Sequence, residues 1–399
     1  KGITVLWIFN LGIFLLYHIG FWSLRFREDI YFLVNTRDRM EQIAPDIIFF
    51  TSISMFFLLL LNARGVRSKN IKLSTVSENH LMERFIYILS IIVILISAIM
   101  SLFINLSDAP LFNIGTYGIA ELVVARHELF GGVVLELLAV PRYIMFYMIF
   151  PVLFYSFGYG IRVSKVALFI GCLFGLLTLA KTFIVINILC LFLGWWFRRG
   201  GFIPVIMAGI VLPIIFYIVV FVSYMVEVNR LFLEVFKVLL QRIIQVPIAL
   251  VTVYKELFFF EEGLISSYWY TLIFCGVKVP IQQIAGNYMA PNAIVVPNAA
   301  CGVLGAAYPN IPLELHAIYY SFIIGAVALS SFFVSRLKTY QLRIAATMII
   351  GLQSIFILLT DPLTAFNSYG FIWSTIFVLF IAFGIPFLRV VSKTELTRI

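Results

Sequence analysis

Residues 279–316 read VPIQQIAGNYMAPNAIVVPNAACGVLGAAYPNIPLELH, and the interpretation of the whole chain starts from this stretch. It has no charged residue before Glu314. Its prolines are Pro280, Pro291, Pro297, Pro309 and Pro312. Each proline removes a backbone donor and restricts the residue before it, so a continuous helix is not expected here. Long non-helical backbone in a membrane protein lies outside the hydrocarbon or lines a protected cavity. We therefore predict a folded, non-helical wall of a site at the membrane surface.

The composition of the chain is that of a polytopic membrane protein. Of its 399 residues, 62% are hydrophobic and 12% are charged, and the mean hydropathy is +1.06. A soluble domain carries about 25% charged residues. The net charge of +9 comes from short basic runs between apolar segments, which is typical of cytoplasmic loops and not of a nucleic-acid-binding surface. The sequence also has no nucleotide-binding glycine loop, GxSxG motif or metal-ligand spacing, which excludes a soluble nucleotide-dependent enzyme.

Ten apolar segments approach the length of about 20 residues that a membrane crossing requires. They are residues 3–22, 45–62, 85–106, 139–158, 165–180, 182–197, 202–224, 312–334, 344–361 and 368–388. Weaker apolar runs at 243–260 and 264–277 are further spans, re-entrant elements or interfacial helices. The basic loops between the spans fall on one side, which makes that side cytoplasmic and places both ends inside. The expected fold is all-α, with about ten or more transmembrane helices in a single integral membrane domain over residues 1–399.

The opposite side of the membrane receives the remaining connections. They are residues 23–44, 107–138, 225–311 and 362–367, together with the turn at Lys181. We expect the large region 225–311 to be periplasmic. Within it, charged residues recur every three or four positions from Glu227 to Lys237, which predicts a surface-lying amphipathic helix over 225–256. Pro247 is expected to kink or end this helix.

Charged residues at the outer boundary are the candidates for chemistry. Residues 121–142 contain Arg126, His127, Glu128 and Arg142. In a helix, consecutive side chains point in different directions, and only residues three or four apart share a face. One interpretation is a solvated helix that leads into a span. The other is that Arg126 binds an anionic group while a neighbouring carboxylate or imidazole takes a proton.

Other candidates are spread over the second half of the chain. Lys181 is a lone charge in an apolar stretch, so it is either functional or reaches the interface. Arg230 and Arg242 lie on the amphipathic segment, where salt bridging on a wet face accounts better for Arg230. Arg242 has no acidic neighbour at helical spacing and is the better ligand contact. Glu314 and His316, where the loop meets a span, are either interfacial or catalytic.

The cysteines do not indicate a metal or redox motif, because none forms a CxxC pair. Cys172 and Cys190 lie in apolar spans and are expected to be packing residues. Cys275 and Cys301 could both face the outside and pair, which sequence alone does not decide.

Three stretches resemble bacterial oligosaccharide repeat-unit polymerases, the O-antigen polymerase (Wzy-type) family of membrane glycosyltransferases. They are ARHELFGG at 125–132, LLTLAKTFIVINILCLFLGWWFRRG at 176–200 and PNAACGVLGAAYPNIPLELHAIYYSFIIG at 297–325. The last departs from the family pattern at Pro312, where another glycine would be expected.

The resemblance implies a GT-C-like enzyme of the bacterial inner membrane, with an active site that faces the periplasm. Its substrates would be glycans on undecaprenyl pyrophosphate, and it would pass the growing chain onto the non-reducing end of a new lipid-linked repeat. The implied product is O-antigen or a related surface polysaccharide. Membrane lipid and a chain-length-regulating co-polymerase are candidate partners, and nucleic acid is not. No metal or other cofactor is required where cationic side chains stabilise the leaving pyrophosphate.

The resemblance also implies roles for the candidate residues. Those expected to hold pyrophosphate or other polar parts of the substrate are Arg126, Lys181, Arg242, Arg142 and Arg230. The candidates for the general base that takes the proton of the acceptor hydroxyl are Glu128, His127, His316 and Glu314. Those expected to contact sugar are Tyr288, Asn292, Asn298 and Tyr308.

Two alternative functions remain open. An O-antigen ligase uses a similar donor with the lipid A core as acceptor, and the sequence does not separate it cleanly from a polymerase. A flippase or transporter would favour two similar halves, and no internal repeat is evident. The sugar, the linkage and the stereochemical outcome are not encoded in any recognisable motif.

Overall fold

The computed structural model describes residues 4–26, 36–63, 244–258, 281–289, 301–337, 340–360, 362–367 and 371–379, with scattered positions between 87 and 214 and at 382. All regular secondary structure in these residues is helical. The elements are α1 Val5–Ile13, the π-helical η1 Phe14–Ile19, α2 Gly20–Phe26, α3 Thr36–Ala63, α12 Val246–Phe258, α14 Ile281–Met289, α15 Val303–Asn310, the 3-10 turn η6 Leu313–Leu315, α16 His316–Ser335, α17 Tyr340–Leu359, α18 Pro362–Asn367 and α19 Phe371–Leu379.

The chain divides into two compact units. The first consists of Lys1–Lys69, Lys237–Arg336 and Thr347–Thr375, and it contains most of the described residues.

Three helical segments are long and apolar enough to cross a membrane. They are Val5–Arg25, Met40–Asn62 and Leu313–Ser335, by length and composition. These segments confirm helices at the predicted spans 3–22, 45–62 and 312–334. The shorter apolar helix Ala346–Leu359 falls within the predicted span 344–361, and α19 falls within 368–388. The predicted spans between 85 and 224 lie almost wholly outside the described residues.

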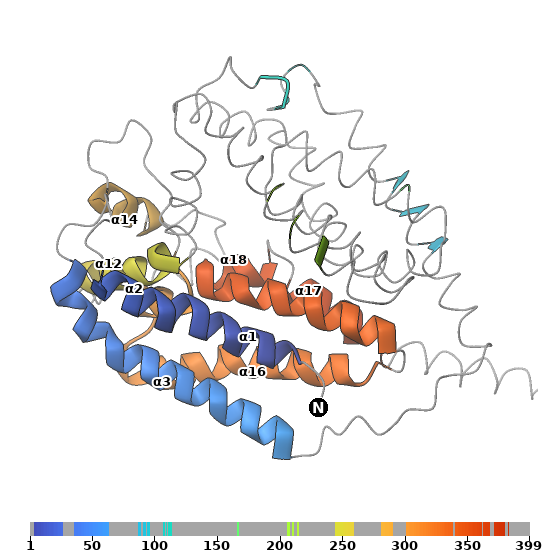
Figure 1. Ribbon diagram of the computed structural model, residues 1–399, viewed down its shortest axis with the longest axis horizontal. Helices are drawn as coiled ribbons and strands as arrows, with labels where there is room; N and C mark the ends of the chain where they lie inside the picture. Colours follow the sequence, from blue (N-terminus) through green and yellow to red (C-terminus); the bar gives the residue numbers. More distant parts are fainter. Residues whose placement is uncertain are drawn as a thin grey trace, which may run out of the picture. The chain divides into compact units, whose positions relative to one another are not determined.

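Helices α1, α3, α16 and α17 run side by side, and α12 and α14 lie towards one end of them (Figure 1). Glycines allow two of these helices to approach closely. A Cβ atom at Gly12 would lie 3.0 Å from Leu358 Cδ1, and one at Gly351 would lie 2.5 Å from Ile8 Cδ1. Ile8, the earlier residue of α1, contacts Gly351, the earlier residue of α17, and Gly12 contacts the later Leu358. The two helices therefore run in the same direction.

An aromatic cluster forms the centre of this bundle. The ring of Phe50 in α3 meets those of Phe9, Tyr17 and Tyr320 edge to face, with centroids 6.3, 6.1 and 5.2 Å away. Such edge-to-face pairs contribute about 0.5–1.5 kcal/mol each beyond the burial of area. The hydroxyl of Tyr17 donates a hydrogen bond of 3.1 Å to the Leu358 carbonyl. The cluster thereby joins helices from both ends of the sequence.

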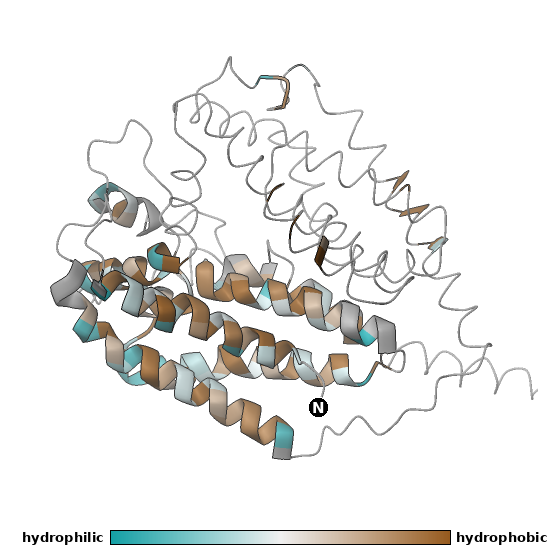
Figure 2. Cartoon of the chain, viewed as in Figure 1, coloured by the Kyte–Doolittle hydropathy of each residue, from teal (hydrophilic) through white to brown (hydrophobic). Residues whose placement is uncertain are grey.

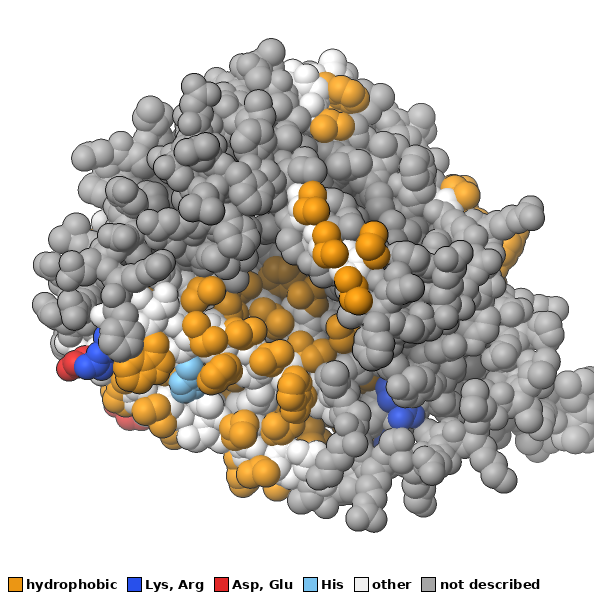
Figure 3. Space-filling view, in the orientation of Figure 1, with side chains coloured by type: hydrophobic (Ala, Val, Ile, Leu, Met, Phe, Trp, Pro, Cys, Tyr) orange, Lys and Arg blue, Asp and Glu red, His pale blue; other side chains and the backbone are white. Residues whose placement is uncertain are grey.

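The outward side of the bundle is apolar, as lipid contact requires. Figure 2 shows hydrophobic residues along the lengths of the helices, with hydrophilic ones mostly near their ends. In Figure 3, hydrophobic side chains cover most of the described surface on this face, and charged ones lie towards its edges. Examples of large exposed apolar side chains are Phe14, Leu59, Ile318 and Phe322. The described unit therefore has the surface of a membrane protein.

The prediction of non-helical backbone over 279–316 is wrong for much of this stretch. It contains α14, α15 and η6, with Pro309 near the end of α15. After Pro309 the backbone leaves the helix at Ile311, which has φ −137° and ψ 133°. The prolines limit the helices to 9 and 8 residues instead of preventing them, because a proline is tolerated where few intrahelical bonds remain to be lost. The expectation that no continuous helix forms is correct over 301–316.

The predicted external connection 23–44 is helical in part, because α2 reaches Phe26 and α3 begins at Thr36, and its side of the membrane stays a prediction. Two other expectations need correction. The surface-lying amphipathic helix does not extend over α12, where every residue from Pro247 to Tyr254 is buried. This apolar run has no polar face, so it packs inside the unit. Of the two outcomes expected at Pro247, the end of a helix is wrong, since this residue follows π-helical residues and lies in the first turn of α12. A kink stays a prediction, because residues 225–243 lie outside the described residues.

Candidate functional site

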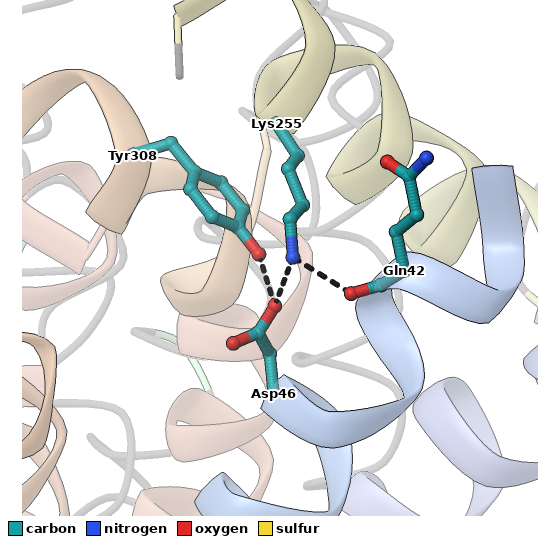
Figure 4. Close-up of polar contacts among 4 residues, drawn as sticks. All are labelled: Gln42, Asp46, Lys255 and Tyr308. Carbon is teal, nitrogen blue, oxygen red and sulfur yellow. Dashed lines mark hydrogen bonds and ion pairs between the residues drawn. The ribbon is translucent and has the colours of Figure 1, made fainter. Parts of the chain in front are cut away.

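Three side chains from separate elements form a polar cluster within the apolar unit. They are Asp46 in α3, Lys255 in α12 and Tyr308 in α15, and we name them the Asp46 cluster (Figure 4). Lys255 Nζ lies 2.8 Å from Asp46 Oδ2. The Tyr308 hydroxyl donates a hydrogen bond of 2.6 Å to the same oxygen. One carboxylate oxygen therefore receives both a cationic and a neutral donor.

Lys255 also contacts the backbone of α3. The Gln42 carbonyl accepts a hydrogen bond of 2.7 Å from Lys255 Nζ. The ammonium thus contacts α3 at two successive turns, through Gln42 and Asp46, as Figure 4 shows.

The cluster is mostly buried but not sealed. The side chains of Lys255 and Asp46 are 18% and 19% exposed, whereas Tyr308 is buried. Burial, and then the nearby Asp46 carboxylate, raises the pKa of the Tyr308 hydroxyl well above its ordinary value. The phenol is therefore a neutral hydrogen-bond donor over the physiological range. Lys255 Nζ also lies 5.5 Å from the centroid of the Tyr308 ring, a cation–π contact.

The two oxygens of Asp46 have different surroundings. Oδ2 accepts both hydrogen bonds of the cluster. Among the described residues, no side chain or backbone group donates a hydrogen bond to Oδ1. The carboxylate is therefore fixed through one oxygen and has the acceptor capacity of the other available.

Two buried aromatic residues of α16 continue the site inwards. The His316 ring lies between those of Tyr308 and Tyr320, with centroids 5.4 and 5.7 Å away. His316 Nε2 lies 3.1 Å from the Ile311 carbonyl, and because a carbonyl only accepts, Nε2 carries the proton. Within the described part of the chain, His316 Nδ1 and the Tyr320 hydroxyl are buried and have no hydrogen-bond partner. Buried polar atoms of this kind are uncommon and often mark a functional site.

Four of the residues predicted from sequence are described, and two of them come together. Tyr308 belongs to the Asp46 cluster and His316 adjoins it. Glu314 is exposed on η6 and does not join the cluster. The Tyr288 hydroxyl on α14 donates a hydrogen bond of 2.9 Å to Glu256, the residue after Lys255. Those outside the described residues are Arg126, His127, Glu128, Arg142, Lys181, Arg230, Arg242, Asn292 and Asn298.

Sequence reasoning missed Asp46 and Lys255. Each borders a long uncharged run, residues 47–62 after Asp46 and residues 243–254 before Lys255. A charge at the edge of an apolar run is a weaker signal than the lone charge that selected Lys181, because Glu256 follows Lys255 and Glu41 lies five positions before Asp46. A search that included charges at the edges of apolar runs would also have found these two residues.

No protein-family model, curated protein sequence or solved structure matches this chain. Within the described residues, no group of His, Cys, Asp and Glu side chains could hold a metal ion. Cys301 is a buried thiol and forms no disulfide, while Cys275 lies outside the described residues. The chemistry that these residues offer is that of a carboxylate, an ammonium, a phenol and an imidazole close to the end of apolar helices.

Proposed function

We propose that the protein is an integral membrane glycosyltransferase that polymerises lipid-linked oligosaccharide repeat units. The donor and acceptor would be glycans on undecaprenyl pyrophosphate, and the product would be O-antigen or a related surface polysaccharide. The reaction would take place at the periplasmic face of the bacterial inner membrane. The finer features of this proposal include ten or more spans, a GT-C-like fold and a periplasmic region over 225–311.

The observation that carries the proposal is the position of the Asp46 cluster relative to the apolar helices. Asp46 lies near the start of the apolar segment Met40–Asn62, and Tyr308 comes just before the apolar segment Leu313–Ser335. A polyprenyl-linked substrate has its tail in the hydrocarbon and its pyrophosphate and sugars at the boundary. A polar cluster at the ends of apolar helices is therefore in a suitable place for such a substrate.

The residue types of the site also suit the reaction. Transfer requires a base for the acceptor hydroxyl and cations that stabilise the charge developing on the leaving pyrophosphate. Asp46 and His316 are of the first type, and Lys255 is of the second. Arg126, Lys181 and Arg242 remain the residues proposed to hold the pyrophosphate, in accordance with the family resemblance.

An assay with purified protein tests the proposal directly. Phospholipid vesicles containing the protein would receive one defined repeat unit on undecaprenyl pyrophosphate, and products would be separated by length. We expect a ladder of products, which Arg126→Ala should abolish without loss of folded protein. Undiminished synthesis by that variant would refute the role of Arg126.

The same assay separates the alternatives. With lipid A core added, transfer of glycan to the core instead of to another repeat would indicate an O-antigen ligase. Movement of the lipid-linked unit across the vesicle without a new glycosidic bond would indicate a flippase. Either result would contradict the polymerase proposal.

A further inference from the structure

We infer that Asp46 is the general base of the glycosyl transfer and takes the proton of the acceptor hydroxyl on Oδ1. This inference rests on the proposed function. It differs from the expectation drawn from sequence, which placed the base among Glu128, His127, His316 and Glu314.

The hydrogen bonds of Asp46 leave one oxygen available for a substrate. Oδ2 accepts from Lys255 Nζ at 2.8 Å and from the Tyr308 hydroxyl at 2.6 Å. Two donors on one oxygen fix the plane and direction of the carboxylate. Oδ1 receives no hydrogen bond from the described residues, and the side chain retains 19% exposure. A sugar hydroxyl could donate a hydrogen bond to Oδ1 without displacing a protein group from the carboxylate.

His316 is less suited to the same role. Its Nε2 lies 3.1 Å from the Ile311 carbonyl. Its Nδ1 is buried, and the ring is packed against those of Tyr308 and Tyr320. A substrate hydroxyl could reach this nitrogen only if the aromatic rings moved apart. Glu314 is exposed, but it lies outside the cluster, and no described residue holds its carboxylate in place.

The bond changes of the step balance without another reactant. The acceptor hydroxyl oxygen forms a bond with the anomeric carbon of the donor glycan. The bond from that carbon to the pyrophosphate oxygen breaks, and its electron pair leaves with the undecaprenyl pyrophosphate. The hydroxyl proton passes to Asp46 Oδ1, while Oδ2 keeps its hydrogen bonds to Lys255 and Tyr308. Asp46 then releases the proton to water.

Lys255 and Tyr308 are positioning residues in this scheme. The ammonium compensates the carboxylate charge in partly buried surroundings, where an unpaired charge would be costly. The phenol, which remains protonated, adds a second donor to the same oxygen. Neither residue needs to exchange a proton for the step to occur.

The test compares Asp46→Asn with Glu41→Gln in the vesicle assay. Glu41 is a matched control because it is an exposed carboxylate on the same helix, 3.5 Å from Arg25. We expect Asp46→Asn to lower kcat by about 10²–10⁴-fold with little change in KM for the acceptor. Glu41→Gln should remain within about twofold of the wild type. A kcat for Asp46→Asn above a tenth of the wild-type value would overturn the inference.

A second comparison covers the case in which Asp46→Asn fails to fold because the ion pair with Lys255 is lost. Lys255→Met combined with Asp46→Asn removes both charges, and it should fold but remain as inactive as a protein without the base. If activity returns in the double variant, the pair is structural and the inference is wrong. Added formate should partly restore the rate of Asp46→Ala, because a small carboxylate can take the proton, whereas a structural defect would not respond.

The outcomes also distinguish failure of the proposed function from failure of the inference about Asp46. A wild-type protein that forms no glycosidic bond would refute the proposed function, and the inference with it. A wild-type ladder together with a fully active Asp46→Asn variant would refute the inference alone.

Discussion

The Tyr308 hydroxyl lies 2.6 Å from Asp46 Oδ2, although the two residues are 262 positions apart in sequence. This hydrogen bond attaches α15 to α3. Lys255 reaches the same oxygen from α12, 209 positions from Asp46. Three elements that are distant in the chain therefore meet at one carboxylate.

Tyr308→Phe removes a buried hydrogen bond to a charged acceptor. We expect the free energy of unfolding in detergent to fall by about 1.5–3 kcal/mol, the range for bonds to charged groups. Tyr288→Phe is the comparison, because the Tyr288 hydroxyl bonds Glu256 at an exposed position and its loss should cost less than about 1 kcal/mol. Thermal unfolding of both variants measures the difference. Equal losses of stability in the two variants would show that the buried hydrogen bond to Asp46 stabilises the protein no more than the exposed bond to Glu256 does.

The ion pair between Asp46 and Lys255 should show strong coupling in a double-mutant cycle. Either Asp46→Asn or Lys255→Met removes one partner of a partly buried ion pair, whereas the double variant removes both charges. We expect the double variant to be destabilised by less than the sum of the single variants, with a coupling of about 1–3 kcal/mol.

Arg25 and Glu41 provide the control for that cycle. Their closest atoms are 3.5 Å apart, with side chains 44% and 74% exposed. Exposed pairs of this kind contribute about 0–1 kcal/mol. We expect additive effects for Arg25 and Glu41. Additive effects at Asp46 and Lys255 as well would show that partial burial does not strengthen the coupling between those two residues.

Two buried tyrosines should respond differently to loss of the hydroxyl. The Tyr17 hydroxyl donates to the Leu358 carbonyl at 3.1 Å, so Tyr17→Phe should cost about 0.5–1.5 kcal/mol of stability. The Tyr320 hydroxyl is buried without a hydrogen-bond partner among the described residues, so Tyr320→Phe should be neutral or stabilising. Melting temperatures in detergent measure both. A clear loss for Tyr320→Phe would mean that a bound group satisfies its hydroxyl.

An added methyl group should have opposite effects on stability at two of the glycines. A Cβ atom at Gly302 would lie 2.0 Å from the Leu358 carbonyl oxygen, a backbone atom that cannot rotate away. Gly302→Ala should therefore destabilise the protein by about 1–3 kcal/mol or more. At Gly325, in the interior of α16, the nearest atom would be 3.9 Å away, so Gly325→Ala should be tolerated or should stabilise by about 0.5–1 kcal/mol. Expression and thermal unfolding of the two variants test this contrast.

Sequence reasoning predicted the apolar helices because hydropathy is a local property. The segments Met40–Asn62 and Leu313–Ser335 follow from the composition of about 20 residues each. It also selected His316, as a residue at a loop–span junction that is either interfacial or catalytic, and Tyr308, as a sugar contact implied by the family resemblance. The proline argument was less successful, because each proline acts only on its own turn, which leaves room for α14 and α15.

Hydropathy along the sequence could not predict which distant residues contact each other. Asp46 and Lys255 each stand beside an apolar run, but nothing in either run identifies the other as its partner. The burial of α12 was missed for a similar reason, since a run such as 246–254 packs inside or faces lipid depending on its neighbours. The predicted pyrophosphate residues lie outside the described part of the chain and stay predictions.

The distance along the chain between Asp46 and Lys255 has a consequence for biogenesis. A carboxylate near the start of an early apolar helix enters the membrane region before its counter-charge has been synthesised. At about 5–20 residues per second, translation of the 209 positions that separate the two residues takes about 10–40 s. During that interval the Asp46 carboxylate lacks the contact with Lys255. The ion pair that joins α3 to α12 therefore forms only after α12 has been synthesised.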